Sequence, residues 1–365
     1  MQRISRRSAA SAILVIAACA AVLEACGSRR SASATTTTIR IAGTPHQDTT
    51  LYMWGIQRGF FQKHNIELDV RDTTFNDQID LVAGNGCDLA MATVDEIAAK
   101  SKNLDLANRR VLYVMPAWLF EGQIFVSRPD LPSLSELKKH HPSEEAAKLF
   151  FRQIRGRKIA VPEGSSYDQA IRRLMKSAGI DPADYAFINS ELEAGINGLS
   201  HSNVALAAAG IVERPEAERR GYTVALDSLD LNMIVIAGFI SSAPFYKNHR
   251  TAVDEFLLTW FESVEDALAH PQDNYRVFSA YLSRRGGNPP TFDEYQRALR
   301  YTIFSRDPSD VYNTFLRPDS PSYWRKPWDG RLRQLRESGQ GDQATPTTAD
   351  FIADEVVARL MRHGQ

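Results

Sequence analysis

The chain has 365 residues, of which 43 are Lys or Arg and 44 are Asp or Glu, so its formal net charge is −1 at pH 7. This balance, without any basic run, excludes a protein that binds a polyanion such as nucleic acid through bulk charge. The hydrophobic share of 43% is ordinary for a globular protein. The length exceeds what one hydrophobic core usually serves, so we expect two lobes.

The first 25 residues are predicted to be an export signal, because MQRISRR is basic and the next stretch is apolar and small. Leu23-Glu24-Ala25-Cys26 resembles the lipobox of bacterial lipoproteins. The resemblance implies cleavage before Cys26, acylation of Cys26 and an exported, membrane-anchored protein facing the periplasm or the cell exterior. Acylation of Cys19, or cleavage of a plain secretory signal, is the alternative. Residues 26–38 are a polar tether that has little apolar surface to bury.

Beyond the tether, short β-like runs alternate with helical patterns, which is typical of an α/β fold. The pattern predicts strands at 38–43, 66–70, 87–92, 111–115, 123–127, 158–161, 185–188, 204–208, 222–225 and 232–240. It predicts helices at 50–58, 77–83, 95–102, 132–153 with a break near Pro142, 166–178, 246–270, 274–284, 293–303 and 348–362. Residues 304–345 match no pattern.

Two successive βαβα sets predict two lobes, each a mostly parallel sheet flanked by helices. We assign residues 39–124 plus 236–345 to lobe one, 125–235 to lobe two and 346–365 to a C-terminal helix. In such sheets ligands bind beyond the carboxyl ends of the strands. The candidate site therefore comprises the loops at 44–50, 93–95, 116–121, 162–167 and 209–213.

The candidate ligand-binding residues are the polar and aromatic side chains on these loops, namely His46, Asp48, Thr93, Asp95, Trp118, Glu121, Ser165, Ser166, Tyr167 and Glu213. Ser165 and Ser166 would offer hydroxyls and backbone N–H groups at a helix start, although Ser165 is equally explained as a helix cap. Acids outnumber arginines, since only Arg214 falls on these loops. This excess favours an amine-bearing or neutral ligand, unless the acids are helix caps or rim charges. Trp118 and Tyr167 could stack on a flat ligand, or Trp118 could belong to the core.

Catalytic and cofactor signatures are missing from the sequence. Gly164-Ser165-Ser166 lacks the second glycine of a nucleophile elbow, and there is no phosphate-binding or dinucleotide fingerprint. His46 and Asp48 have no further ligand at metal-binding spacing, and Cys87 is the one cysteine beyond the tether. We therefore expect no cofactor, no metal and no enzymatic activity.

Four segments together carry a family resemblance: a helix that ends in Gly59-Phe60-Phe61, residues 83–90, residues 157–166, and Ser-Ala-Gly-Ile-Asp-Pro at 177–182. In order and spacing they resemble the solute-binding proteins of bacterial ABC importers, of the nitrate/sulfonate/taurine and thiamine-pyrimidine-precursor type. The resemblance covers about residues 39–270.

This resemblance implies a type II periplasmic-binding-protein fold in a monomer that captures a small molecule between its lobes. The implied partners are a membrane permease and its ATPase, and no nucleic acid. Two alternatives stay open: an enzyme that uses the same cleft on a small heteroaromatic substrate, and a ligand-sensing lipoprotein without a transporter.

Overall fold

The structure is a computed structural model that describes residues 36–44, 46–74, 77–106, 110–201, 203–337 and 351–363. The side chains of residue 47, residues 101–106 and residue 363 are not described. The predicted signal, Cys19, Cys26 and nearly all of the tether lie outside the described residues. Among the described residues, no helix is both long enough and apolar enough to span a membrane.

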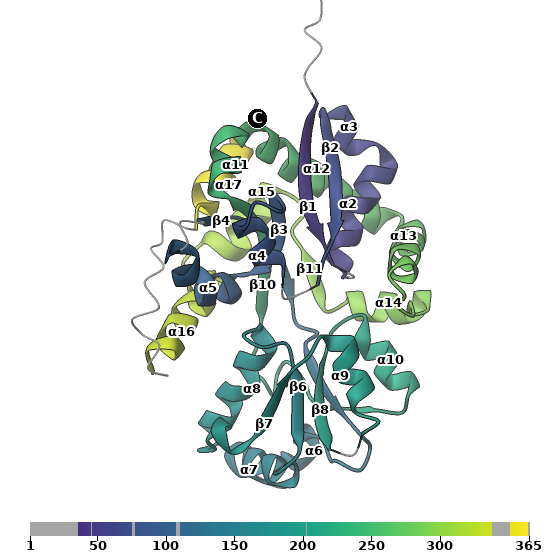
Figure 1. Ribbon diagram of the computed structural model, residues 1–365, viewed down its shortest axis with the longest axis vertical. Coiled ribbons are helices and arrows are strands. Elements are labelled where there is room, and N and C mark those ends of the chain that lie inside the picture. The colour runs from purple at the N-terminus through teal and green to yellow at the C-terminus, as the bar shows by residue number, and fades with distance from the viewer. Residues whose placement is uncertain are drawn as a thin grey trace, which may run out of the picture. The chain divides into compact units, whose positions relative to one another are not determined.

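Two separate sheets organise the described chain (Figure 1). The first sheet has six strands in the order β11-β4-β10-β3-β1-β2. Its strands are β1 (Thr37–Gly43), β2 (Ile66–Asp72), β3 (Leu89–Thr93), β4 (Val111–Phe120), β10 (Val235–Ser242) and β11 (Thr302–Phe304). The second sheet has five strands in the order β7-β6-β8-β5-β9. Its strands are β5 (Ile124–Ser127), β6 (Lys158–Val161), β7 (Ala186–Asn189), β8 (Val204–Ala209) and β9 (Thr223–Leu226). We call the first sheet with its helices lobe one and the second lobe two.

The α/β class with two helix-flanked sheets is confirmed, but the strand directions are more mixed than expected. Strand β1 pairs with β3 in parallel, as β6 does with β7 and β8. Strand β10 is antiparallel to both β3 and β4, β11 is antiparallel to β4, and β5 is antiparallel to β8 and β9. Strands β10 and β5 are antiparallel because the chain enters them from the other lobe, and not through a crossover helix of the same lobe.

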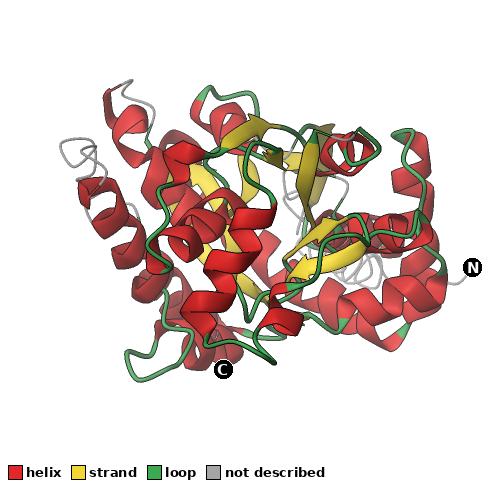
Figure 2. Cartoon of the chain, turned by 90° about the horizontal axis from the view of Figure 1, so that it is seen from below, coloured by secondary structure: helices red, strands yellow, loops and turns green. Residues whose placement is uncertain are grey.

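Helices enclose both sheets (Figure 2). Lobe one carries α2 (Gln47–Arg58), α3 (Phe60–Lys63), α4 (Gln78–Ala83), α5 (Val94–Leu106), α11 (Ala243–Asn248), α12 (Arg250–Ala269), α13 (Pro271–Arg284), α14 (Phe292–Leu299), α15 (Pro308–Val311), the π-helical turn η2 (Tyr312–Leu316), α16 (Arg325–Leu335) and α17 (Ala353–His363). Lobe two carries α6 (Leu134–Leu137), α7 (Ser143–Gln153), α8 (Ser166–Ser177), the 3₁₀ turn η1 (Pro182–Asp184), α9 (Leu192–Gly198) and α10 (Glu213–Arg219).

Local chemistry explains where the helices at the cleft begin and end. Helix α2 ends at Gly59, whose φ of 75° lies in the left-handed region that glycine adopts without strain. Helix α8 begins after Ser165, whose side chain accepts a hydrogen bond from the Asp168 backbone N–H. Helix α5 follows Thr93, whose hydroxyl accepts from the Glu96 backbone N–H while the Glu96 carboxylate accepts from the Thr93 N–H.

Several predicted boundaries were wrong, for identifiable reasons. The long apolar run at 232–240 begins its strand only at Val235, because Leu231 and Met233 donate back to Asp227 and Ser228 in a turn. The helix predicted at 293–303 ends at Leu299, and the next residues form β11 against β4. The predicted loop at 116–121 is mostly the end of strand β4, and the predicted helix at 246–270 is two helices that meet at His249.

The C-terminal helix α17 packs into lobe one beside β4. The Ile352 N–H donates to the Tyr113 carbonyl, and Phe351 stacks between Tyr113 and Trp324 with ring centroids 5.0 and 3.5 Å away. The Arg359 guanidinium donates to both oxygens of the Asp254 carboxylate, at 2.7 and 2.6 Å. Since Asp254 is buried and Arg359 is partly buried, this bidentate pair fixes α17 against α12.

Strand β10 lies between β3 and β4, and all eight of its residues are buried. The pairing register of β10 with β4 shifts between Ala237 and Gly238. A Cβ atom at this glycine would lie 2.1 Å from the Met115 carbonyl oxygen and 2.6 Å from the Pro116 Cα. Only a glycine fits there, since the contacting atoms are backbone.

We predict that Gly238→Ala lowers the free energy of unfolding by about 3 kcal/mol, because a clash with backbone atoms cannot be relieved by a rotamer change. Gly330→Ala is the control: no atom lies within 4 Å of the added Cβ, and the position is inside α16. It should stabilise the protein by about 0.5–1 kcal/mol through helix propensity. Urea unfolding of both variants measures this, and equal effects would contradict the close approach.

Candidate functional site

An inner cavity of ≈ 60 Å³ lies between the two lobes. Lobe one supplies its wall from β3, β4, β10 and the starts of α2 and α5, and lobe two adds residues from α8, α9 and the end of β8. The lining residues are Thr44, His46, Asp48, Gln78, Met91, Ala92, Thr93, Glu96, Trp118, Phe120, Gln123, Tyr167, Leu192, Gly210, Ile211, Val235 and Ala237. Ten of the 17 are apolar or aromatic, counting Gly210, and the other seven are polar; such a mixed wall is compatible with a small-molecule site.

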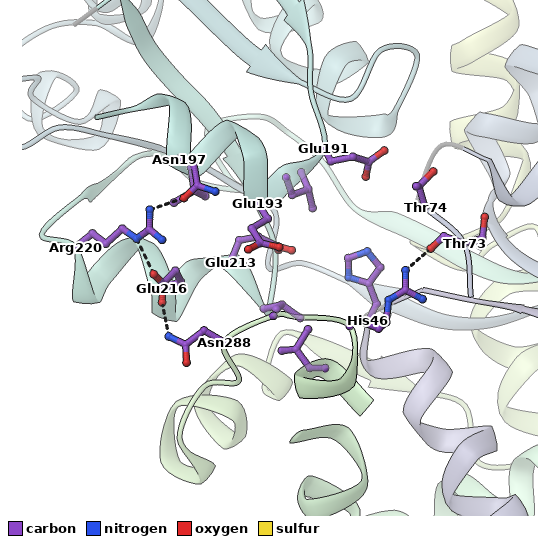
Figure 3. Close-up of a pocket in the computed structure, with 16 residues that line it drawn as sticks. His46, Thr73, Thr74, Glu191, Glu193, Asn197, Glu213, Glu216, Arg220 and Asn288 are labelled. Atoms are coloured by element: carbon purple, nitrogen blue, oxygen red, sulfur yellow. Dashed lines mark hydrogen bonds and ion pairs between the residues drawn. The ribbon is translucent and has the colours of Figure 1, made fainter. Parts of the chain in front are cut away.

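An outer cavity of ≈ 230 Å³ adjoins the inner one through His46 and Leu192, which line both. Figure 3 shows Glu191 and Glu193 of lobe two around the same opening as His46, Thr73 and Thr74 of lobe one. Its lining residues are His46, Thr73, Thr74, Glu191, Leu192, Glu193, Ile196, Asn197, Val212, Glu213, Glu216, Arg220, Leu282, Arg285, Gly287 and Asn288. The two cavities together form the cleft.

The structure brings six of the ten predicted site residues to this cleft. They are His46, Asp48, Thr93, Trp118, Tyr167 and Glu213. Four others are not among the described residues that line either cavity: Asp95, Glu121, Ser165 and Ser166. Asp95 lies in the first turn of α5, and Glu121 lines a different cavity beside Ser228 and Tyr301. Whether any of the ten binds a ligand stays a prediction.

The two predicted serines are buried and their hydroxyls contact protein atoms. The Ser165 hydroxyl donates to the Pro162 carbonyl at 2.6 Å while it caps α8. The Ser166 hydroxyl accepts from the Gln123 side-chain amide at 3.0 Å. Ser166 therefore contacts Gln123, which lines the inner cavity, and does not line that cavity itself.

Two polar atoms on the wall of the inner cavity have no hydrogen-bond partner among the described residues. They are the indole N–H of Trp118 and the side-chain carbonyl oxygen of Gln123. Trp118 is 7% exposed and Gln123 is 4% exposed, so water reaches them poorly. An unsatisfied buried donor or acceptor costs about 1–3 kcal/mol. A bound molecule that pairs with both atoms would recover this free energy.

Three carboxylates at the cleft have raised pKa values because burial disfavours their charged forms. Burial raises the pKa of Asp48 to about 6. It raises the pKa of Glu96 to about 7, with a further contribution from the charge of Asp95. It likewise raises the pKa of Glu213 to about 7, helped by the nearby Glu193 and Glu191. Perturbed carboxyl groups of this kind are frequent at functional sites.

Two basic side chains at the cleft, His46 and Arg285, offer little positive charge to a ligand. Burial, and then the charge of Arg285, lowers the pKa of His46 to about 4, so this imidazole is neutral at pH 7. The Arg285 guanidinium donates to the carbonyls of Gly43 and Thr73 at 3.0 and 2.7 Å and pairs with Asp72 at 3.0 Å. Arg285 therefore fixes the loops after β1 and β2 at the entrance.

Two polar contacts cross between the lobes beside the outer cavity. The Asn288 amide donates to the Glu216 carboxylate at 3.1 Å, as Figure 3 shows, and the Arg219 guanidinium donates to Glu294 at 2.8 Å. Arg219 and Glu216 belong to α10 of lobe two, while Asn288 and Glu294 belong to lobe one. These contacts hold the lobes together on this side.

Sequence reasoning missed part of the cleft. It placed Arg214 as the single arginine of the loops, whereas Arg220 and Arg285 line the outer cavity. Arg285 lies far along the chain at the end of α13, and no local pattern marks it. Glu96 was also missed, although Thr93 and Glu96 have the Thr-x-x-Glu spacing of a capping box. Among the described residues, no group of three or more His, Cys, Asp or Glu could hold a metal ion.

Comparisons with known proteins place this cleft in context. Residues 150–274 match the family model described as "NMT1/THI5 like". Among solved structures, the alkanesulfonate-binding protein SsuA from Xanthomonas axonopodis pv. citri, bound to MOPS, superposes with a TM-score of 0.61. The alignment covers 89% of this chain and 99% of that one at 12% identity.

A ligand-binding component of an ABC-type import system from Staphylococcus aureus, with zinc bound, gives a TM-score of 0.63 at 13% identity and covers 89% and 99% of the two chains. The chain has the fold of the periplasmic binding proteins. The resemblance inferred from the sequence is thus confirmed for the fold and for the matched family model.

The desulfurization enzyme DSZB shares this binding-protein fold, with a TM-score of 0.59, 13% identity and coverage of 90% and 99%. No curated protein matches the sequence.

We predict that Glu213→Gln stabilises this binding-protein fold at high pH. The carboxyl group has a pKa of about 7 when folded against an ordinary 4.5, so the stability of the wild type falls as pH rises from 4.5 to 7. At about pH 8 the neutral variant should be more stable by about 1–3 kcal/mol, and below about pH 4 the difference should disappear.

Thermal unfolding at several pH values measures this difference. His46, whose pKa is lowered, acts with the opposite sign in both proteins and so cancels in the comparison. The matched control is Glu121→Gln, because the Glu121 side chain is exposed. A Glu213→Gln protein that is less stable than the wild type at every pH would show that the carboxylate is held by stronger contacts than the Gly210 N–H.

Proposed function

We propose that the protein is an extracytoplasmic solute-binding lipoprotein that captures a small organic ligand between its lobes and delivers it to the permease of an ABC importer. The observation that carries the proposal is the inner cavity, whose wall comes from both lobes. A ligand that touches both walls stabilises the closed arrangement, which is how such proteins convert binding into a shape that a permease recognises.

In this proposal lobe one comprises residues 39–124 plus 236–345, lobe two comprises 125–235, and 346–365 is the C-terminal helix. The chain passes between the sheets twice, between β4 and β5 and between β9 and β10. The Ser228 hydroxyl donates to the Glu121 carbonyl and joins the two crossings. Bending at these crossings would open the cleft once the Arg219–Glu294 pair is broken.

The neighbours in fold support this function by what they bind. One is described as an alkanesulfonate-binding protein and another as the ligand-binding component of an ABC-type importer. We extend the role of binding and import to this chain, with the permease and its ATPase as partners and a monomer as the working form. The lipobox-like segment around Cys26 adds a lipid anchor outside the cytoplasm.

An enzyme in the same cleft is the alternative, because DSZB shares the fold. Cys87, the free cysteine in the described part of the chain, does not favour it. This thiol is buried outside both cavities, and burial raises its pKa, which disfavours the nucleophilic thiolate. We therefore propose binding without turnover.

Native mass spectrometry of freshly purified protein tests this function. We expect a small molecule to co-purify, to be released unchanged by denaturation, and to be retained less by Trp118→Ala than by the wild type, because Trp118 lines the inner cavity. Glu265→Gln, at an exposed acid on α12 outside both cavities, should retain it fully. Chemical conversion of the released molecule on incubation with fresh protein would instead mean that the cleft is an active site, and a Trp118→Ala protein with full retention would place the ligand elsewhere.

The proposed anchor generates a separate prediction. Metabolic labelling with a fatty acid should mark the wild type and Cys19→Ser but not Cys26→Ser, because the cysteine that follows the cleavage site carries the lipid. Two acyl chains hold a protein stably, at about 0.8 kcal/mol per buried CH₂ group. Equal labelling of all three proteins would contradict lipidation at Cys26, and loss of label only in Cys19→Ser would move the site to the alternative cysteine.

A further inference from the structure

The cleft contains more acidic groups than free basic groups. Asp48 and Glu96 line the inner cavity, and Glu191, Glu193, Glu213 and Glu216 line the outer one. The two arginines at the outer cavity are engaged with protein acceptors: Arg285 as described above, and Arg220 with Glu216 and Asn197, both at 2.6 Å. Neither guanidinium offers its charge freely to a bound anion.

Two carboxylates of the inner cavity are held by hydrogen bonds from neighbouring residues of their own helix starts. The Asp48 carboxylate accepts the Thr49 N–H at 2.8 Å with Oδ1, and the Glu96 carboxylate accepts the Thr93 N–H at 3.0 Å with Oε2. The Asp48 carboxylate accepts from backbone N–H groups, its own and that of Thr49, and the Glu96 carboxylate accepts from both the N–H and the hydroxyl of Thr93. The charge of Lys100 makes a smaller contribution that lowers the pKa of Glu96. Asp48 and Glu96 both line a cavity that the neutral His46 also lines, so the nearest imidazole adds no positive charge.

An independent observation points to a ligand at the same place. The Gln123 side-chain oxygen and the Trp118 indole N–H, both more than nine-tenths buried, line the inner cavity without a partner among the described residues. The Gln123 oxygen accepts a hydrogen bond, as the carboxylates do. The Trp118 ring packs edge-on against Phe120, with ring centroids 6.1 Å apart, and Tyr167 lines the same cavity.

We propose that the ligand is a small organic cation, namely a protonated amine attached to a flat apolar group. This proposal rests on the proposed function. The ammonium group of the ligand donates to Asp48 and Glu96 and to the Gln123 oxygen, and its apolar part packs against Trp118, Phe120 and Tyr167. The buried carboxylates would repel an anion such as a sulfonate, since desolvated like charges repel strongly. The ligand class thus differs from that of the sulfonate-binding neighbours in fold.

This assignment couples ligand binding to protons. Burial raises the pKa of Asp48 to about 6 and of Glu96 to about 7, and an ammonium group beside a carboxylate favours its ionised form. Binding near neutral pH should therefore release protons, and affinity should fall as pH decreases from about 8 to 6. Tyr52 on α2 interacts with the charge of Asp48, and Tyr113 on β4 and Tyr167 on α8 interact with the charge of Glu96. Asp95 and Lys100 act on Glu96 from α5 itself, and His46 lines the same cavity.

Isothermal titration calorimetry with three probes of matched ring size tests the proposal. The probes are benzylamine, benzyl alcohol and benzenesulfonate, which are cationic, neutral and anionic. At about pH 8 we expect benzylamine to bind roughly tenfold more tightly than benzyl alcohol, and benzenesulfonate not to bind at millimolar concentration. Titrations of benzylamine near pH 7 in buffers of different ionisation enthalpy should report proton release.

Single-residue variants test whether the preference for benzylamine comes from the carboxylate of Glu96 in the cleft. Glu96→Gln should weaken benzylamine binding roughly tenfold while leaving benzyl alcohol unchanged, because the amide keeps an acceptor for the Thr93 N–H but loses the charge. Glu265→Gln, at an exposed acid on α12 that lines neither cavity, is the matched control and should change neither. Thermal unfolding of each variant shows that it is folded.

Each other outcome overturns the inference. Binding of benzenesulfonate without benzylamine would show an anion site while leaving solute binding intact. Equal affinity of Glu96→Gln and the wild type for benzylamine would mean that the negative charge of Glu96 does not contribute to binding. If none of the probes binds at millimolar concentration, the ligand class is wrong, and native mass spectrometry of the co-purified molecule then decides separately whether the proposed function stands.

Discussion

The return of the chain into the middle of the first sheet is the constraint on which the rest of the structure depends. Strand β10 must fit between β3 and β4 after the chain has built the whole second sheet, and at Gly238 it approaches β4 so closely that no side chain is tolerated. Because β10 is buried along its full length, its burial fixes both crossings between the lobes. The cleft lies between two separate sheets, which the chain links at the two crossings, and contacts such as Arg219 with Glu294 also join the lobes.

The electrostatics of the cleft follow from this arrangement. Asp48, Glu96 and Glu213 begin helices or lie in first turns, where a carboxylate caps backbone N–H groups in many soluble proteins. At an exposed helix start such acids would stay ionised. Here burial at the cleft disfavours their charged forms, so their pKa values rise to between about 6 and 7. A common capping element thereby becomes a group that responds to charge and to pH.

Much of the fold could be predicted from sequence because local patterns were consistent. The strands at 158–161 and 204–208 and the helix at 166–178 are found within one residue of their predicted bounds. Failures occurred where tertiary contacts override a local pattern. The sequence pattern predicted a helix as far as Ile303. Residues 302–304 instead form strand β11, because they pair with the edge of β4. Residues 304–337 have no strong periodicity and fold as short helices against the core, as Trp324 and Trp328 do around Phe351.

The sequence by itself determined the α/β class, the order of the elements and the position of loops such as those carrying Asp48, Thr93 and Glu213, since hydrophobic periodicity and capping residues act over a few neighbours. Only the tertiary structure decided which of these residues meet. It brought Arg285 from the end of α13 to the loops after β1 and β2, turned Ser166 toward Gln123 and left Glu121 outside the cleft. The physical reason is that burial, unpaired hydrogen-bond groups and raised pKa values are properties of the space between two lobes, and no local stretch of sequence encodes that space.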